Sequence, residues 1–146
     1  MFKRILVPVD DSSPSLRGLR VALELARRLK ARLRLIHLGN AIPPAPRKRE
    51  GMTAQELFAA MKKQGEKLLE NQAALCRARG VKTDTALYIA LAGRPSKLVV
   101  AEAREWRADL IVMGTHGRHG LRRVALGSDA EDVARISTVP VLMIRK

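Results

Sequence analysis

The chain has 146 residues, of which 47% are apolar and 3% aromatic, so we expect one domain over residues 1–146 with a core of aliphatic side chains. Its single cysteine excludes an internal disulfide bond. A signal-peptide pattern is absent and no apolar stretch nears ~18 residues, which predicts a cytoplasmic protein without a membrane span.

The first forty residues predict a strand, a helix and a second strand. Lys3 to Val9 has the apolar, β-branched character of a buried strand. In the turn that follows, Ser13 is expected to cap a helix and Pro14 to occupy its first position. Arg32 to Leu38 predicts the second strand. The helix between them carries an apolar stripe at helical spacing: Leu19, Ala22, Leu23, Ala26 and Leu29.

The middle of the chain predicts an irregular connection and a long helix. Residues 40–52 contain three prolines and predict an irregular, mobile loop. Thr53-x-x-Glu56 forms a capping box, and Gly80 ends the helix that it opens. The apolar face of this helix is Leu57, Phe58, Met61, Gly65, Leu68, Leu69, Gln72, Leu75 and Cys76. We therefore expect Cys76 to be an inert core thiol.

The remaining elements alternate in the same way. The expected order is a strand at Val81–Ile89, a helix after Gly93-Arg94-Pro95-Ser96, a strand at Asp109–Met113, a helix at Ser128–Ser137 and a strand at Val139–Ile144. Strands that alternate with helices of this length favour a parallel sheet covered on both faces, with right-handed crossovers.

A glycine-rich, basic loop separates the fourth strand from the last helix. Gly114, Gly117 and Gly120 lie three residues apart among several arginines, and Gly127-Ser128 opens the helix. A strand, such a loop and a helix N-terminus are what a phosphate site requires, because glycines let backbone N–H groups approach the anion. The spacing is neither that of a P-loop nor G-x-G-x-x-G.

Read as Gly114-x2-Gly117-x9-Gly127-Ser128, the loop resembles the nucleotide-binding signature of the universal stress protein family. The segments Ile5–Asp10, Leu35–Leu38, Ala108–Gly117 and Val139–Ile144 are similar to that family in order and spacing. The resemblance implies an α/β fold of the Rossmann-like, adenine nucleotide alpha hydrolase-like type: a doubly wound, five-stranded parallel sheet in the order 3-2-1-4-5. Ligands in such sheets bind at the carboxyl ends of the strands beside the switch point, here the first and fourth.

The resemblance also implies a site for an adenine nucleotide, ATP or else AMP or ADP, with Mg²⁺ as an accompanying ion. Asp10 would bind a ribose or hold a metal through water. The implied adenine-lining residues are Pro8, Val9, Leu38 and Met113, and the implied residues around the phosphates are Gly114, Gly117, Arg118, Gly127, Ser128 and Asp129. Alternatives stay open, because Asp10 can cap the first helix, the apolar residues can be strand-end packing, and Ser128-x-x-Glu131 is a capping box.

The sequence favours a binding module over a catalyst. His116 and His119 do not match the H-x-G-H motif of nucleotidyl transferases, and no Ser, Cys or carboxylate pair stands at catalytic spacing around the loop. We expect a stress-response regulatory protein with at most slow ATP hydrolysis. The alternative is a family member that binds no nucleotide and acts through protein contacts, which Asp129 favours because its carboxylate would repel phosphates.

Two kinds of association are expected. The strand at 139–144 should lie at the edge of the sheet, and the resemblance implies a homodimer through that edge. The net charge of +14 predicts non-specific adhesion to polyanions at low salt. Specific recognition of nucleic acid is not expected, because aromatic side chains that could stack on bases are scarce.

Overall fold

A computed structural model describes residues 1–40, 51–90, 94–115 and 128–145. Along the chain its elements are β1 (Arg4–Pro8), α1 (Ser13–Leu29), β2 (Arg32–Asn40), α2 (Ala54–Ala78), β3 (Thr83–Ala90), α3 (Pro95–Glu105), β4 (Leu110–Gly114), α4 (Ser128–Ile136) and β5 (Val141–Ile144). All neighbouring strands pair in parallel, in the order β3-β2-β1-β4-β5. The expected fold class and strand order are confirmed.

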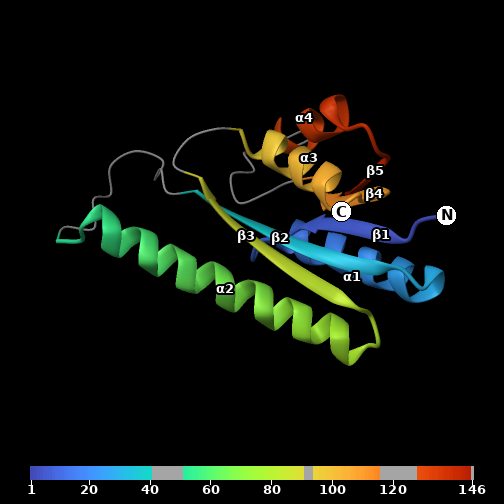
Figure 1. Cartoon of the computed structure of the whole chain (residues 1–146), viewed down its shortest axis with the longest axis horizontal. Helices are drawn as coiled ribbons and strands as arrows, with labels where there is room; N and C mark the ends of the chain where they lie inside the picture. Colours follow the sequence, from blue (N-terminus) through green and yellow to red (C-terminus); the bar gives the residue numbers. More distant parts are fainter. Residues whose placement is uncertain (41–50, 91–93, 116–127, 146) are drawn as a thin grey trace.

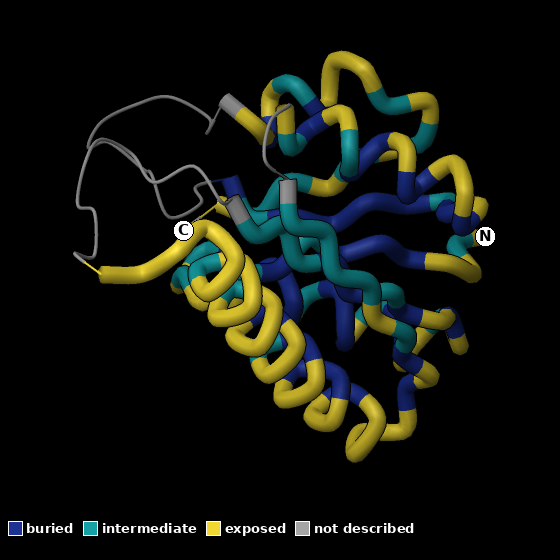
Figure 2. The backbone as a smooth tube through the Cα atoms, turned by 60° about the vertical axis from the view of Figure 1, so that its left-hand side comes forward, coloured by how far each residue is buried: buried dark blue, intermediate teal, exposed yellow. Residues whose placement is uncertain are grey.

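The sheet separates two apolar cores (Figure 1). α1 and α2 cover one face, and α3 and α4 cover the other. Side chains alternate along β1, so that Ile5 and Val7 pack toward α1 and α2 while Leu6 packs toward α3 and α4. Figure 2 shows the buried strands enclosed between helices whose outer sides are exposed. Both faces of β1 are therefore buried, as its continuous apolar sequence predicts.

The predicted N-terminal caps of α1 and α2 have different outcomes. The capping box of α2 is confirmed, with the Glu56 N–H donating to Thr53 Oγ1 at 3.1 Å and the Thr53 N–H donating to Glu56 Oε2 at 2.9 Å. The expectation that Ser13 caps α1 is wrong by one residue. Ser12 has the extended backbone of a cap, and its Oγ accepts the Ser15 N–H at 3.3 Å, so Ser13 is already helical.

β2 is longer than expected. It runs past Leu38 to Asn40, and Asn40 pairs with Ala90 at the end of β3. The irregular connection expected over residues 40–52 therefore begins after β2, and residues 41–50 lie outside the described part of the chain.

β3 and β5 each begin two residues later than expected. The Val81 N–H donates to the Cys76 carbonyl at 3.2 Å, which turns the chain out of α2 before β3 starts. The Val139 N–H donates to Ser137 Oγ at 3.1 Å, and Pro140 has no N–H, so regular pairing of β5 starts only at Val141. Local side-chain and turn bonds thus shorten both strands.

α2 packs closely on β2 and β3 along part of its length. A Cβ atom at Gly65 would lie 2.6 Å from Leu87 Cδ1, so a larger residue there would require the Leu87 side chain to shift. Cys76 is fully buried as expected, and burial raises the pKa of its thiol. Phe58 and Leu75, expected on the apolar face, are 42% and 47% exposed. The apolar stripe is therefore only partly covered by the sheet.

Candidate functional site

β1 and β4 end side by side where the strand order reverses. The two strands pair in parallel through Ile5↔Leu110 and Leu6↔Ile111. From β1 the chain continues to β2 and β3 on one side, whereas β4 and β5 lie on the other. Their carboxyl ends, Pro8 and Gly114, therefore lie together along one edge of the sheet, the edge formed by the ends of the strands and not by an outer strand. This edge at the switch point is where open α/β sheets bind ligands.

Asp10 is held by hydrogen bonds in the turn directly after β1. Its Oδ1 accepts the Ser12 N–H at 2.8 Å, and its own N–H donates to Ser15 Oγ at 2.8 Å. Ser15 is buried, so the turn is anchored to the start of α1. The half-buried carboxylate of Asp10 keeps its second oxygen without a hydrogen bond to any described residue. That oxygen is available to accept from a ligand hydroxyl.

Three hydrogen bonds fix the last residues of this segment. The Val9 N–H donates to the Ile36 carbonyl at 2.8 Å. His37 Nδ1 lies 2.8 Å from the Val9 carbonyl and must donate, because a carbonyl only accepts. Gln72 Nε2, from the buried side chain on α2, donates to the Asp10 carbonyl at 3.4 Å. β2 and α2 together set the position of Asp10.

Gly114 ends β4 in contact with the first turns of α1. A Cβ atom there would lie 2.5 Å from the Pro14 carbonyl, and one at Gly18 would lie 3.1 Å from the Gly114 nitrogen. The next residue, Thr115, is buried, and its N–H donates to the Ile144 carbonyl at 3.1 Å. The start of the glycine loop is therefore clamped between α1 and β5.

The expected adenine-lining residues divide between the two faces of the sheet. Leu38 and Met113 belong to the core beneath α3 and α4, and Pro8 is half-buried at the end of β1 between their strands. Val9 instead packs in the core beneath α1 and α2. The structure thus brings Leu38 and Met113 to one face and turns the Val9 side chain to the other.

Half of the expected phosphate site falls beyond the described residues. Gly117, Arg118 and Gly127 are among residues 116–127, and His116 and His119 lie in the same stretch. Ser128 begins α4, and Asp129 is exposed in the first turn of that helix. These expectations, including the capping box at Ser128, stay predictions.

A family model for the universal stress protein family matches residues 1–145. The chain belongs to this family. Among its relatives, YxiE of Bacillus subtilis is 32% identical over 151 residues, with 99% of this chain and 100% of the relative covered. A universal stress protein of Methanocaldococcus jannaschii is 34% identical over 147 residues, with 100% of this chain and 84% of the relative covered.

Solved structures of universal stress proteins have the same fold. One from Burkholderia pseudomallei is 29% identical with a TM-score of 0.75, covering 98% of this chain and 96% of that one. A universal stress protein in complex with cAMP is 26% identical, with a TM-score of 0.70 and coverage of 98% and 97%. One from Archaeoglobus fulgidus in complex with dAMP is 26% identical, with a TM-score of 0.65 and coverage of 98% and 98%.

This universal stress protein also has a buried charged cluster that its sequence did not lead us to expect. Glu102 on α3 is 3% exposed, and its Oε1 accepts from Arg34 Nη1 at 2.8 Å. The Tyr88 hydroxyl donates to the other carboxylate oxygen. Arg34 lies over the Trp106 ring, 5.0 Å from its centroid. The guanidinium and the hydroxyl compensate the carboxylate for its lost hydration.

The buried cluster borders the candidate site, because Tyr88 pairs with Leu38 across β2 and β3. The hydrogen bond to Glu102, and then burial, raise the pKa of Tyr88 to about 12. A signal was present in the sequence: Arg34 occupies an inward position of a buried strand, and Glu102 lies on the apolar stripe of its helix. Charged residues at core positions are rare unless they are paired.

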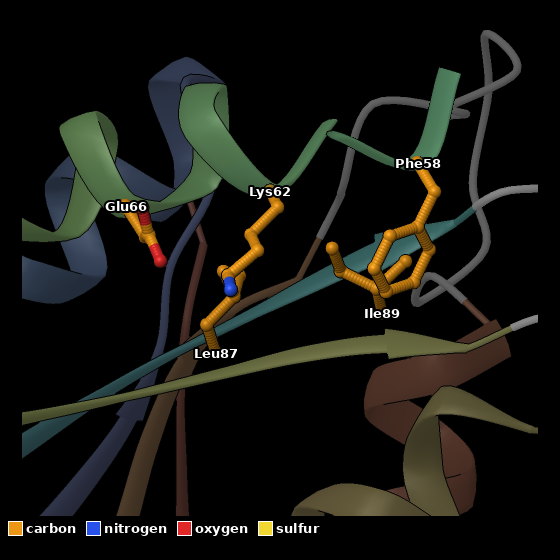
Figure 3. A pocket seen from close by; sticks show the side chains of 5 residues that line it. All are labelled: Phe58, Lys62, Glu66, Leu87 and Ile89. Atoms are coloured by element: carbon orange, nitrogen blue, oxygen red, sulfur yellow. The ribbon is translucent and has the colours of Figure 1, made fainter. Parts of the chain in front are cut away.

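The other features of the described residues give weaker indications of a functional site than the edge where β1 and β4 end. Figure 3 shows a hollow between α2 and β3 lined by Phe58, Lys62, Glu66, Leu87 and Ile89, with side chains of mixed character on the outside of the sheet. Within residues 1–40, 51–90, 94–115 and 128–145, three or more His, Cys, Asp or Glu side chains nowhere gather as a metal site would require. The helices of these residues are too short or too polar to cross a membrane.

Proposed function

We propose that this chain is a cytoplasmic stress-response regulator that binds an adenine nucleotide at the edge where β1 and β4 end. The observation that carries the proposal is the juxtaposition of Asp10, one of whose carboxylate oxygens has no hydrogen bond to a described residue, and Gly114 at the switch point of the sheet. Similarity to universal stress proteins solved with cAMP and dAMP supports an adenine nucleotide as the ligand class.

Each described residue at the edge has a proposed role. This second carboxylate oxygen of Asp10 accepts from the ribose hydroxyls. Leu38 and Met113, which belong to one core, provide an apolar wall for the adenine ring. Pro8 and Val9 hold the end of β1 between Leu38 and Met113. The Val9 backbone is fixed by two hydrogen bonds, one to the Ile36 carbonyl and one from the His37 side chain.

The phosphates are proposed to extend from Gly114 toward the start of α4. The spacing of Gly117, Arg118 and Gly127-Ser128 supports this placement, since glycines admit backbone donors and arginine pairs with phosphate. The N-terminus of α4 would add the positive end of the helix dipole, which favours a bound anion.

ATP with Mg²⁺ is the proposed physiological ligand. Mg²⁺ is usually held by one or two carboxylates together with phosphates, and Asp10 and Asp129 would supply the carboxylates. Asp129 also favours a second candidate function, protein contacts without a nucleotide, because a carboxylate in the first turn of α4 repels phosphate when no metal is present.

Binding rather than catalysis fits the chemistry around Asp10. The hydroxyls of Ser12 and Ser15 both accept backbone N–H groups of the turn, so they fix its shape. We further propose that the chain forms a homodimer through β5, which lies at one edge of the sheet.

Titration calorimetry with AMP, and with ATP with and without Mg²⁺, tests the proposal. We expect saturable binding of one nucleotide per chain at moderate salt. Asp10→Asn keeps an acceptor for the Ser12 N–H but removes the charge, and should weaken AMP binding about tenfold, as expected for a lost charge-assisted hydrogen bond. Asp84→Asn, near the opposite edge of the sheet, is the matched control. Heat that is weak and disappears with salt would mean that the net charge, not a site, attracts the nucleotide.

A further inference from the structure

Exposed cations gather where the strands begin, at the edge of the sheet opposite the candidate site. We call this group the basic rim. In Figure 1 the ends of α1 and α2 and the starts of β1, β2 and β3 come together on the right-hand side. The members of the basic rim, all exposed, are Lys3, Arg4, Lys30, Arg32, Arg79, Lys82, Arg104 and Arg107.

Part of the basic rim forms a row across the sheet. Neighbouring segments are tied by backbone bonds, from the Leu33 N–H to the Lys82 carbonyl at 2.9 Å and from the Arg32 N–H to the Lys3 carbonyl at 2.9 Å. The turn before β4 adds Arg107 on the other side of β1. Because adjacent strands lie about 4.8 Å apart, the row spans roughly 14 Å. A row of this kind suits a linear polyanion.

Most of this charge has no acidic partner among the residues that the structure describes. Arg32 pairs with Asp84 at 3.1 Å. By contrast, several rim cations make no side-chain hydrogen bond or salt bridge to any residue that the structure describes: Lys30, Arg79, Lys82, Arg104 and Arg107. The turns that lead from α1 to β2, from α2 to β3 and from α3 to β4 each contribute at least one of them.

The backbone gives a second, independent indication. Lys30 (φ 52°) and Arg107 (φ 56°) adopt the left-handed conformation, which side-chain-bearing residues disfavour. At the equivalent turn after α2 the chain uses Gly80 (φ 81°). Attraction of cations to helix C-termini does not require this strain, because Arg27 and Arg28 already lie in the last turn of α1. Two cations of the basic rim therefore occupy turn positions where glycine would fit the backbone with less strain.

We propose that the basic rim binds the phosphate backbone of nucleic acid without regard to base sequence, leaving the nucleotide site at the opposite edge free. Cations without aromatic neighbours suit phosphate contacts rather than base stacking. An anionic membrane fits less well, because it favours apolar side chains gathered beside the cations. The exposed large apolar side chains of the described residues are instead spread over several elements.

The test uses the full chain and a fluorescently labelled 20-nucleotide oligothymidylate, with anisotropy followed as salt is raised. The rim variant combines Lys30→Gly, Arg79→Gln, Lys82→Gln and Arg107→Gly, where glycine suits the positive φ. The control variant carries Arg20→Gln, Lys62→Gln, Lys63→Gln and Lys67→Gln, which remove the same charge from exposed positions elsewhere. We expect the rim variant to lose at least tenfold affinity at 0.1 M salt and the control less than threefold.

The salt dependence gives a second readout. Loss of four phosphate contacts should reduce the slope of log affinity against log salt by roughly 3, at about 0.7 per contact for single strands. Equal losses in the rim and control variants would overturn the proposal in favour of diffuse attraction. So would displacement of the oligonucleotide by saturating AMP, or binding to phosphatidylserine vesicles without binding to the oligonucleotide.

The double variant Arg79→Gln, Lys82→Gln leaves both strained turns untouched and serves if the fourfold variant does not fold. It should still lose more affinity than Lys62→Gln, Lys63→Gln. The oligonucleotide result does not depend on the proposed function, because AMP binding is measured separately. Retained rim binding without AMP binding would contradict the nucleotide proposal alone.

Discussion

A Cβ atom at Gly114 would lie 2.5 Å from the carbonyl carbon and oxygen of Pro14, so the end of β4 packs directly against the backbone of the first turn of α1. Real Cβ atoms do not approach backbone this closely, and neither partner is a flexible side chain that could give way. The contact fixes Gly114 relative to the turn that carries Asp10. The geometry of the candidate site therefore depends on having glycine, which has no side chain, at position 114.

Gly114→Ala should lower the free energy of unfolding by about 1–3 kcal/mol, the usual range for overpacking. It should also weaken AMP binding, because α1 and β4 must separate. Gly39→Ala is the control, since its Cβ would meet neighbours no closer than 3.5 Å. Denaturant unfolding and calorimetry measure both effects. Equal stability of the two alanine variants would contradict the contact.

Tyr88, the single tyrosine, should ionise at a higher pH than an ordinary tyrosine. Its hydrogen bond to Glu102 raises the pKa of Tyr88 from 10 to about 12, so phenolate absorbance should rise near pH 12 in the folded protein. The folded state then holds a proton that the unfolded state has lost. This contribution to stability is complete below pH 10 and disappears as the pH rises through about 12.

Tyr88→Phe isolates this effect from lysine and arginine titration. The wild type should lose more stability between pH 10 and pH 12 than the variant does, measured by denaturant unfolding at each pH. Identical slopes would mean that Tyr88 and Glu102 do not interact in solution.

Cys76 should react only when the protein opens. Its side chain is fully buried, and burial raises the pKa of the thiol, so little reactive thiolate is accessible. Modification by a chromogenic disulfide reagent should follow the rate of unfolding and accelerate in denaturant. Leu75→Cys in a Cys76→Ala background moves the thiol to a position that is 47% exposed and should react at once. Fast modification of the native wild type would contradict this burial.

Asp129 should make ATP binding depend on magnesium. At about 6 Å and an effective dielectric near 20, a carboxylate and a phosphate charge repel by roughly 3 kcal/mol, and exposure of Asp129 reduces this by screening. Asp129→Val should tighten metal-free ATP about three- to tenfold, and AMP less. Glu131→Val, in the same turn, is the control. Calorimetry that finds both affinities unchanged would place Asp129 away from the phosphates.

The proposed dimer can be tested by the direction of the β5 donors. The Pro140 and Ile144 carbonyls accept hydrogen bonds from the β4 segment, so the backbone N–H and C=O of Leu142, between them, also point toward β4. The backbone N–H and C=O of Met143 therefore point toward the open edge. Met143→Pro should remove an outward donor and convert a sedimenting dimer into a folded monomer. Leu142→Pro should instead break the β4–β5 pairing and lower stability. A wild type that sediments as a monomer would contradict the dimer.

How far the sequence predicts the structure depends on the range of the interaction. The capping box at Thr53 is local, and its two residues suffice to identify it. The choice of Ser12 over Ser13 as cap depends on bonds that join Asp10, Ser12 and Ser15 in a single turn. The strand order is predicted from the family resemblance, because the alternation of strands and helices along the chain does not by itself determine that order.

The buried cluster required knowledge of the tertiary register. Arg34 and Glu102 are 68 residues apart, and the sequence around each residue does not indicate that they form a hydrogen bond. At the candidate site, the positions of Asp10 and Gly114 follow from the strand ends, but the turning of Val9 away from Leu38 follows only from the pleat of the sheet. The glycine loop cannot be compared, because residues 116–127 lie outside the described chain.

The place of β1 in the middle of the sheet has a consequence for synthesis. Its partners include Asp109, which accepts the Arg4 N–H across 105 residues, and the Trp106 carbonyl, which accepts from the Arg4 guanidinium across 102. On the ribosome β1 can pair with β2 early, but its second edge waits until β4 has emerged. Until then an apolar strand with unpaired backbone groups is exposed to other nascent chains. A translational pause before β4 would therefore leave this chain most dependent on chaperones.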